Sequence, residues 1–71
     1  MTWSVADELA VTKRRLHEDE VRRSAQTALI KTLNGRGQST AEAEHVRREI
    51  EATLVTLRAR RLSLEALQRH P

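Results

Sequence analysis

The chain has 71 residues, a formal net charge of +3 and a single aromatic residue, Trp3. It contains no cysteine, which excludes both a disulfide-stapled fold and a thiolate metal site. No apolar run approaches the roughly 18 residues that a membrane-spanning helix needs, and Asp7 and Glu8 interrupt the apolar start of the chain. We therefore expect one small, soluble, cytoplasmic domain that makes no membrane contact.

One long helix is expected over residues 4–34. Alanine, leucine, glutamate, arginine and glutamine dominate the chain, and all of them favour helices. Ser4, with Asp7 three residues later, is a weak signal for the start of this helix. A heptad register then predicts which stripe of the helix faces a neighbour: Val5, Leu9, Thr12, Leu16, Asp19, Arg23, Gln26, Ile30 and Leu33.

The middle of this stripe is polar, because Asp19, Arg23 and Gln26 occupy positions that usually hold aliphatic side chains. Buried polar groups at such positions cost stability and often fix the register of helix pairing. The alternative is that Arg23 bends outward toward Glu20 or Glu49, so that only its aliphatic stem is covered. We favour this second arrangement.

A cluster of helix-breaking residues predicts a turn at residues 35–38. We expect Gly35 to take the left-handed conformation that ends a helix after Asn34. Gly37 then gives the turn further freedom. A short turn between two helices predicts that they lie side by side and antiparallel.

A second helix is expected over residues 39–69. Ser39 and Glu42 match a capping box, in which the hydroxyl accepts from an amide near Glu42 and the carboxylate reaches back. The facing stripe of this helix is predicted to be Ala43, Val46, Ile50, Thr53, Leu57, Arg60, Leu64 and Leu67. The fold class is thus all-α, an antiparallel two-helix hairpin of coiled-coil type, and Trp3 is expected to cover its open end near Leu67.

Small and aliphatic residues also recur on the side of each helix opposite its facing stripe. These are Val21, Ala25, Ala28, Ala52, Val55, Ala59 and Leu62. A lone hairpin buries one stripe per helix, and a domain of this size rarely has a core worth more than a few kcal/mol. The sequence therefore predicts a partner interface, formed by homodimerisation into a four-helix bundle or by docking on another helical protein. The competing interpretation is that alanine is simply the best helix former and these positions are exposed.

Two pairs copy the spacing of metal ligands in di-iron helical bundles. They are Glu42 with His45 and, in reverse order, His17 with Glu20. In a closed hairpin the two histidines lie ~16 Å apart along the helix axis, so we interpret both pairs as solvated. No nucleophile with a base at a fixed spacing and no phosphate-binding loop is present in the sequence. We expect no catalytic residues, no metal and no cofactor, and therefore no enzyme.

Basic residues from the two helices fall at one level of the predicted hairpin: Lys13, Arg14, Arg15, Arg58, Arg60 and Arg61. Such a belt can contact phosphates, so a small nucleic-acid-associated regulator is the alternative function. Consecutive residues on a helix point about 100° apart, and no stacking aromatic residues accompany the belt. We therefore favour the non-enzymatic protein–protein interaction module.

The stretch 16–67 resembles a group of short, uncharacterised helical-hairpin proteins common in soil- and plant-associated proteobacteria. The matching residues are Gln26, Leu29, Ile30, Leu33, the turn Gly37-Gln38-Ser39-Thr40, Ala43-Glu44, Glu51, Thr53 and Leu54. Gln38 and Ser39 depart from the usual turn of that group, and Arg23 stands where an aliphatic residue is more usual. The resemblance implies a hairpin fold and a bacterial origin, and it brings no known activity, ligand or functional residue.

Overall fold

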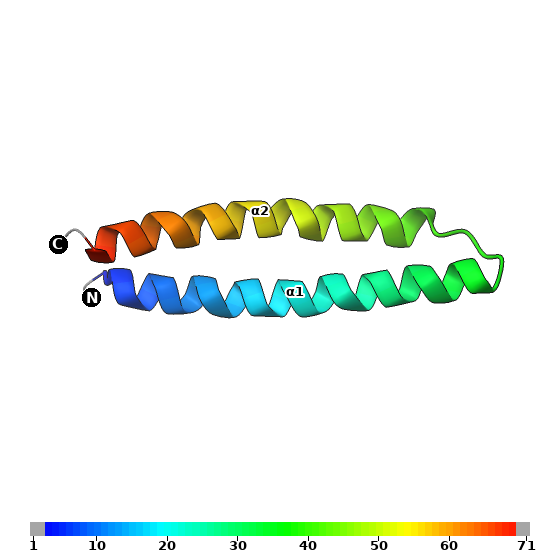
Figure 1. The fold of residues 1–71 in the computed structure, drawn as a ribbon, viewed down its shortest axis with the longest axis horizontal. Coiled ribbons are helices and arrows are strands. Elements are labelled where there is room, and N and C mark those ends of the chain that lie inside the picture. The colour runs from blue at the N-terminus through cyan, green and yellow to red at the C-terminus, as the bar shows by residue number, and fades with distance from the viewer. Residues whose placement is uncertain (1–2, 70–71) are drawn as a thin grey trace.

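The computed structural model describes residues 3–69 and contains two helices, α1 (Val5–Gly35) and α2 (Ala41–Arg69). The helices lie side by side and antiparallel, with the two ends of the chain at one end of the hairpin (Figure 1). The hairpin measures 55 × 18 × 17 Å, so it is a thin rod. Neither α1 nor α2 is long and apolar enough to cross a membrane. The prediction of an all-α fold built from two packed helices is confirmed.

The start of α1 is capped as the sequence predicted. The Ser4 hydroxyl accepts a hydrogen bond from the Asp7 backbone N–H at 3.4 Å, and the Ser4 carbonyl accepts from the Glu8 N–H at 3.1 Å. Asp7 and Glu8 lie in the first turn of the helix. Their negative charges are favourable there because the helix dipole is positive at its N-terminus.

The end of α1 forms a Schellman motif centred on Gly37. The Gln38 N–H donates to the Leu33 carbonyl at 2.9 Å, and the Gly37 N–H donates to the Asn34 carbonyl at 3.1 Å. Gly37 has a φ of +67°, the left-handed conformation that favours glycine. The prediction that Gly35 takes this conformation was wrong. Gly35 is the last residue of α1, and the left-handed residue is Gly37, two positions after it.

Substitution of the two glycines by alanine is expected to have opposite effects. A Cβ at either position meets nothing within 4 Å, so only the backbone conformation distinguishes them. Gly37→Ala forces a side chain into the left-handed region and should lower the free energy of unfolding by about 1 kcal/mol. Gly35→Ala should leave it unchanged or raise it by about 0.5 kcal/mol, because alanine favours the helix. Urea unfolding of both variants checks this, and an equal stability for the two would contradict the assigned turn.

The start of α2 differs from the predicted capping box. The Ser39 hydroxyl accepts from the Ala41 N–H at 3.3 Å rather than from an amide near Glu42. The carbonyl of Thr40 takes the first helical hydrogen bond, from the Glu44 N–H at 2.9 Å. Because the chain still runs in the turn at Ser39, the helix begins at Ala41 rather than at residue 39.

The core runs along the contact between the helices, and α1 contributes buried residues to it only in the half away from the turn. The buried apolar side chains are Leu9, Leu16, Ala43, Ile50, Leu54, Leu57 and Leu64, and Thr12 is buried with them. Leu54 is completely inaccessible and packs in one cluster with Leu16, Ile50 and Leu57. The heptad register predicted that Thr53, rather than Leu54, faces α1, and that prediction was wrong. After Ile50 the contact stripe advances by four residues instead of three, so Leu54 points inward and Thr53 is exposed.

Three other predictions differ from the structure, and the shift explains the first of them. Arg60 is exposed and Arg61 is partly buried, although the register predicted Arg60 at the contact. Leu67 is also exposed. Trp3 is 62% exposed, so the predicted cover over the open end near Leu67 does not form.

The polar middle of α1 is partly open to solvent. Asp19 is partly buried and forms an ion pair with Arg22 at 3.3 Å. Arg23 turns outward as favoured, but its nearest carboxylate is Glu51, at 4.0 Å, rather than Glu20 or Glu49. Among the described residues, none between His17 and Glu42 is buried. In the half of the hairpin near the turn the buried side chains, Ala43 and Ile50, therefore come from α2 alone.

Candidate functional site

Two shallow grooves run along the contact between α1 and α2. The first, which we call the turn groove, has a volume of about 380 Å³ and is lined by Gln26, Leu29, Leu33, Ser39, Glu42, Ala43 and Val46. The second, the terminal groove, has a volume of about 330 Å³ and is lined by Glu8, Val11, Thr12, Arg15, Thr56, Leu57 and Arg60. Both are formed by side chains of the two helices together.

Both grooves open on the same side of the hairpin. On α1, Glu8 and Arg15 line the terminal groove, and Leu29 lies fourteen residues beyond Arg15 in the turn groove. Seven residues are nearly two full turns of a helix, so these side chains share one side of α1. The same spacing relates Val46 and Arg60 on α2. We call this side the groove face.

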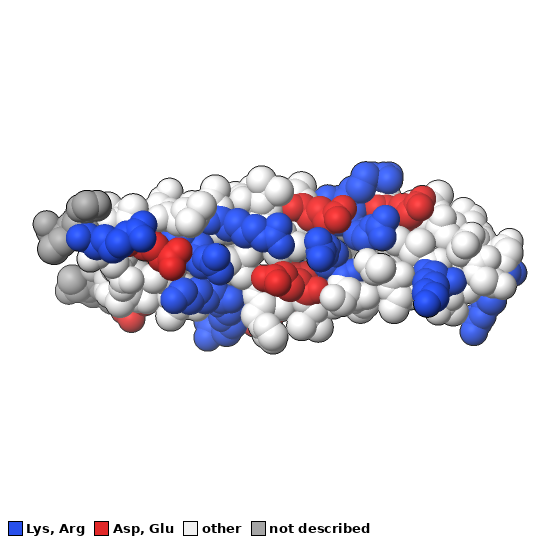
Figure 2. Space-filling view, in the orientation of Figure 1, with Lys and Arg blue, Asp and Glu red and all other residues white. Residues whose placement is uncertain are grey.

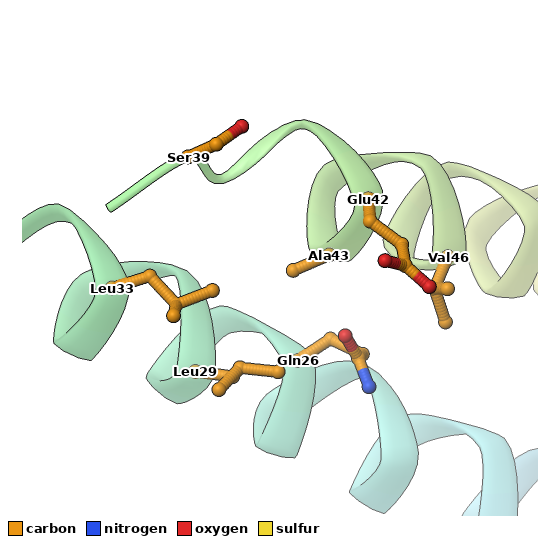
Figure 3. Close-up of a pocket in the computed structure, with 7 residues that line it drawn as sticks. All are labelled: Gln26, Leu29, Leu33, Ser39, Glu42, Ala43 and Val46. Carbon is orange, nitrogen blue, oxygen red and sulfur yellow. The ribbon is translucent and has the colours of Figure 1, made fainter.

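The turn groove is mainly apolar. Figure 3 shows Leu29 and Leu33 of α1 facing Ala43 and Val46 of α2 across the gap, with Ser39 and Glu42 at the rim. The groove exists because Ala43 is small and leaves space opposite the two leucines. Leu29 is 43% exposed.

Gln26 adds an unsatisfied polar group to the wall of the turn groove. Its Oε1 atom is buried and has no hydrogen-bond partner. A buried acceptor without a donor costs about 1–3 kcal/mol. Such atoms in folded proteins are nearly always paired, and Arg61 Nε is a second one, outside the turn groove.

The terminal groove is more polar and holds the clearest link between the helices. Glu8 and Arg60 form an ion pair across it at 2.7 Å. The Thr12 hydroxyl donates to the Glu8 carbonyl at 2.8 Å, and Val11 is half-buried on the same side. This groove therefore helps to fix the register of the hairpin as well as shaping its surface.

The opposite side of the hairpin is covered by charges. In Figure 1 the turn lies to the right with α2 above α1, whereas in Figure 3 the turn lies to the left with α2 still above α1. The two figures therefore view the hairpin from opposite sides. Figure 2 has the orientation of Figure 1 and thus shows the side away from the grooves. Lysine or arginine and aspartate or glutamate alternate there over both helices. We call this side the charged face.

All seven residues of the predicted interface are exposed: Val21, Ala25, Ala28, Ala52, Val55, Ala59 and Leu62. Val21, Val55 and Leu62 are 55%, 65% and 62% exposed. Apart from Ala25, which lies between Arg22 and Leu29 toward the groove face, the α1 and α2 members lie on the outer sides of their helices, which point away from each other in a two-helix rod. One partner helix therefore cannot cover both sets. The sequence did not predict the grooves: Val46 was assigned to the facing stripe, and the aliphatic Leu29 beside the α1 stripe was the only signal for the turn groove.

The six predicted phosphate-contacting residues do not form one patch. Arg60 is paired with Glu8 at 2.7 Å and Arg61 with Glu65 at 3.6 Å. Arg15 lines the terminal groove. The other three, Lys13, Arg14 and Arg58, are exposed at separate angles around the rod.

The candidate metal pairs are not assembled into a site. His45 Nε2 lies 3.0 Å from Glu49 Oε1, one turn along α2, while Glu42 lies at the rim of the turn groove. Within residues 3–69 no three histidine, aspartate or glutamate side chains are grouped so as to hold a metal ion. Glu42 and His45 are both exposed.

Comparisons of the chain with protein-family models, with curated proteins and with solved structures gave no match. The groove face is the most distinctive surface of the described residues, because it is built by both helices and contains the apolar turn groove.

Proposed function

We propose that the chain is a non-enzymatic protein–protein interaction module that self-associates into a homodimer with four helices. The observation that carries the proposal is the poor burial of α1 near the turn. No described residue between His17 and Glu42 is buried, and the aliphatic residues Leu29, Leu33 and Val46 line an open groove there.

The energetics support covering this region. Complete burial of one leucine or valine side chain contributes about 1.5–3 kcal/mol. A chain of this size has little stability to spare, and it has no disulfide to compensate. A second hairpin laid over the groove face would supply the apolar contacts that a two-helix layer lacks.

Sedimentation equilibrium over a wide range of micromolar concentrations tests the proposal. We expect a mass that rises from 8.1 kDa toward twice that value as the concentration increases. A mass that stays at the monomer value up to the highest concentration would overturn self-association. The chain would then need a different helical protein as its partner.

Nucleic-acid binding is the alternative function. Carboxylates already hold Arg60 and Arg61, which reduces the positive charge available to phosphates. Retardation of DNA or RNA that weakens steeply with salt, and that is lost on replacing Arg58, Arg60 and Arg61 with glutamine, would favour this alternative instead.

A further inference from the structure

We infer that a second copy of this chain docks antiparallel on the groove face, with the turn of each copy against the open end of the other. The two-fold axis would pass between the helices near Glu18, Arg22 and Thr53. This inference rests on the proposed self-association and adds the surface, the orientation and the central contacts.

The groove-facing residues of α1 can be read directly from the two grooves. Glu8, Val11 and Arg15 line the terminal groove, and Leu29 lines the turn groove. Steps of seven residues from these positions place three more on the same face. In chain order the row is Glu8, Val11, Arg15, Glu18, Arg22, Ala25 and Leu29.

This row is complementary to itself when one copy is turned end for end. Val11 then meets the partner's Leu29, and Arg15 meets the partner's Ala25. Glu18 meets the partner's Arg22. Every contact occurs twice, as a two-fold interface requires. The axis of this pairing lies midway between Glu18 and Arg22, at the middle of α1 (Val5–Gly35), so the two copies overlap along their full length and Glu8 alone has no counterpart in the partner's row.

The charges at the centre are free to pair. Glu18 is exposed and has no ion-pair partner among the described residues. The Arg22 side chain is 66% exposed, and its bond to Asp19 uses one of its two terminal nitrogens. A guanidinium has five N–H donors and can therefore hold a second carboxylate.

The other two-fold arrangement, with both turns at one end, is disfavoured by charge. Arg15 and Arg60 line the same groove, so they lie at one level of the hairpin. Rotation about the long axis would bring Arg15 against the partner's Arg60, which already pairs with Glu8 at 2.7 Å. That contact therefore offers no attraction, whereas the antiparallel arrangement gains the Glu18–Arg22 contact twice.

The same antiparallel operation brings α2 against α2 near Thr53. The Arg23–Glu51 contact at 4.0 Å and the packing of Leu16 with Leu57 place Thr53 level with the Glu18–Arg22 centre. Thr53 lies midway between Val46 and Arg60, so it is on the groove face. Thr53 therefore meets the partner's Thr53.

The ends of the hairpin fit the same arrangement. Leu67 lies seven residues beyond Arg60 and is 54% exposed. In the antiparallel pair it reaches the turn of the partner, beside the partner's Ser39 in the turn groove. An exposed leucine of one copy thus comes next to the open apolar groove of the other.

A single cysteine tests the orientation, because the natural chain has none. Thr53→Cys places two thiols together at the axis, and we expect mild oxidation to convert the protein to a disulfide-linked dimer. Ala52→Cys is the matched control, since its side chain points about 100° away on α2. Equal cross-linking of the two variants would overturn the inferred orientation.

Charge reversal tests the central contacts by sedimentation equilibrium. Glu18→Arg alone should weaken the dimer about tenfold, because two attractive pairs become two repulsive ones. The double variant Glu18→Arg/Arg22→Glu should return to within about threefold of the wild type. Glu20→Arg adds the same charge on the opposite side of α1 and should have little effect.

The outcomes separate the two proposals. A wild-type chain that stays monomeric overturns the proposed function and this inference with it. A dimer that responds equally to Glu18→Arg and Glu20→Arg, and that does not cross-link through position 53, overturns the inference alone. Selective cross-linking together with rescue by the double reversal supports both.

Discussion

Replacing Leu54 with alanine is expected to remove most of the stability of the hairpin. Leu54 has 0% of its surface exposed and is packed among Leu16, Ile50 and Leu57. Leucine-to-alanine changes at such sites cost about 2–5 kcal/mol, because apolar contacts are lost and a cavity remains. A chain of this size has about that much stability in total. Urea unfolding followed by far-ultraviolet circular dichroism should show a largely unfolded variant in water.

Leu62→Ala is the matched control for this prediction. It makes the same chemical change on the same helix, but Leu62 is 62% exposed. We expect its free energy of unfolding to stay within about 0.5 kcal/mol of the wild type. If the two substitutions cost the same, α2 does not present Leu54 to α1 and the observed register is wrong.

Leu29→Glu is expected to have the largest effect on self-association. Leu29 lines the turn groove and, in the antiparallel dimer, faces the partner's Val11. The substitution places a carboxylate at an apolar contact twice per dimer, which should weaken association by about 100-fold. Because Leu29 is 43% exposed in the single hairpin, the helix content should remain close to that of the wild type. Sedimentation equilibrium and circular dichroism measure the two quantities.

The double variant Val55→Glu/Leu62→Glu distinguishes the groove face from the outer side of α2. Both residues were predicted from the sequence as interface residues, and both are exposed. The antiparallel dimer leaves them in solvent, so we expect the dimer to persist within about threefold of wild-type affinity. Dissociation of this variant, with Leu29→Glu still dimeric, would place the interface on the outer side instead.

Much of the fold follows from the order of residue types along the chain. Helix-favouring composition and one glycine-containing break predict two helices, and the Ser4 cap forms as expected. Buried positions such as Leu16 and Leu57 also agree with the heptad pattern. These features depend on local preferences and on a period that the sequence displays directly.

The predictions that were wrong concern features that depend on packing between the helices. After Ile50, both a three-residue and a four-residue step are compatible with a heptad, and only contact with α1 decides that Leu54 enters the core. Similarly, Gly35 and Gly37 can both end a helix, and the hydrogen bonds from Gly37 and Gln38 decide between them. The residue pattern of one helix shows neither the contact of Leu54 with α1 nor the hydrogen bonds of the turn.

The candidate site was harder to predict for the same reason. The sequence of one helix shows an apolar stripe opposite its contact stripe. It does not show how the apolar stripes of α1 and α2 point relative to each other, because that depends on how the two helices pair. The turn groove depends on the small side chain of Ala43 opposite Leu29 and Leu33. Its volume is therefore a property of the pair of helices, and neither helix shows it alone.

Small-angle X-ray scattering of the wild-type chain tests the central claim, that a second copy covers the groove face. It measures the mass and the longest dimension in one experiment. We predict twice the 8.1 kDa monomer mass with a length little greater than the 55 Å of one hairpin, because the copies overlap fully. A particle with the monomer mass, or a dimer of nearly doubled length, would contradict the account.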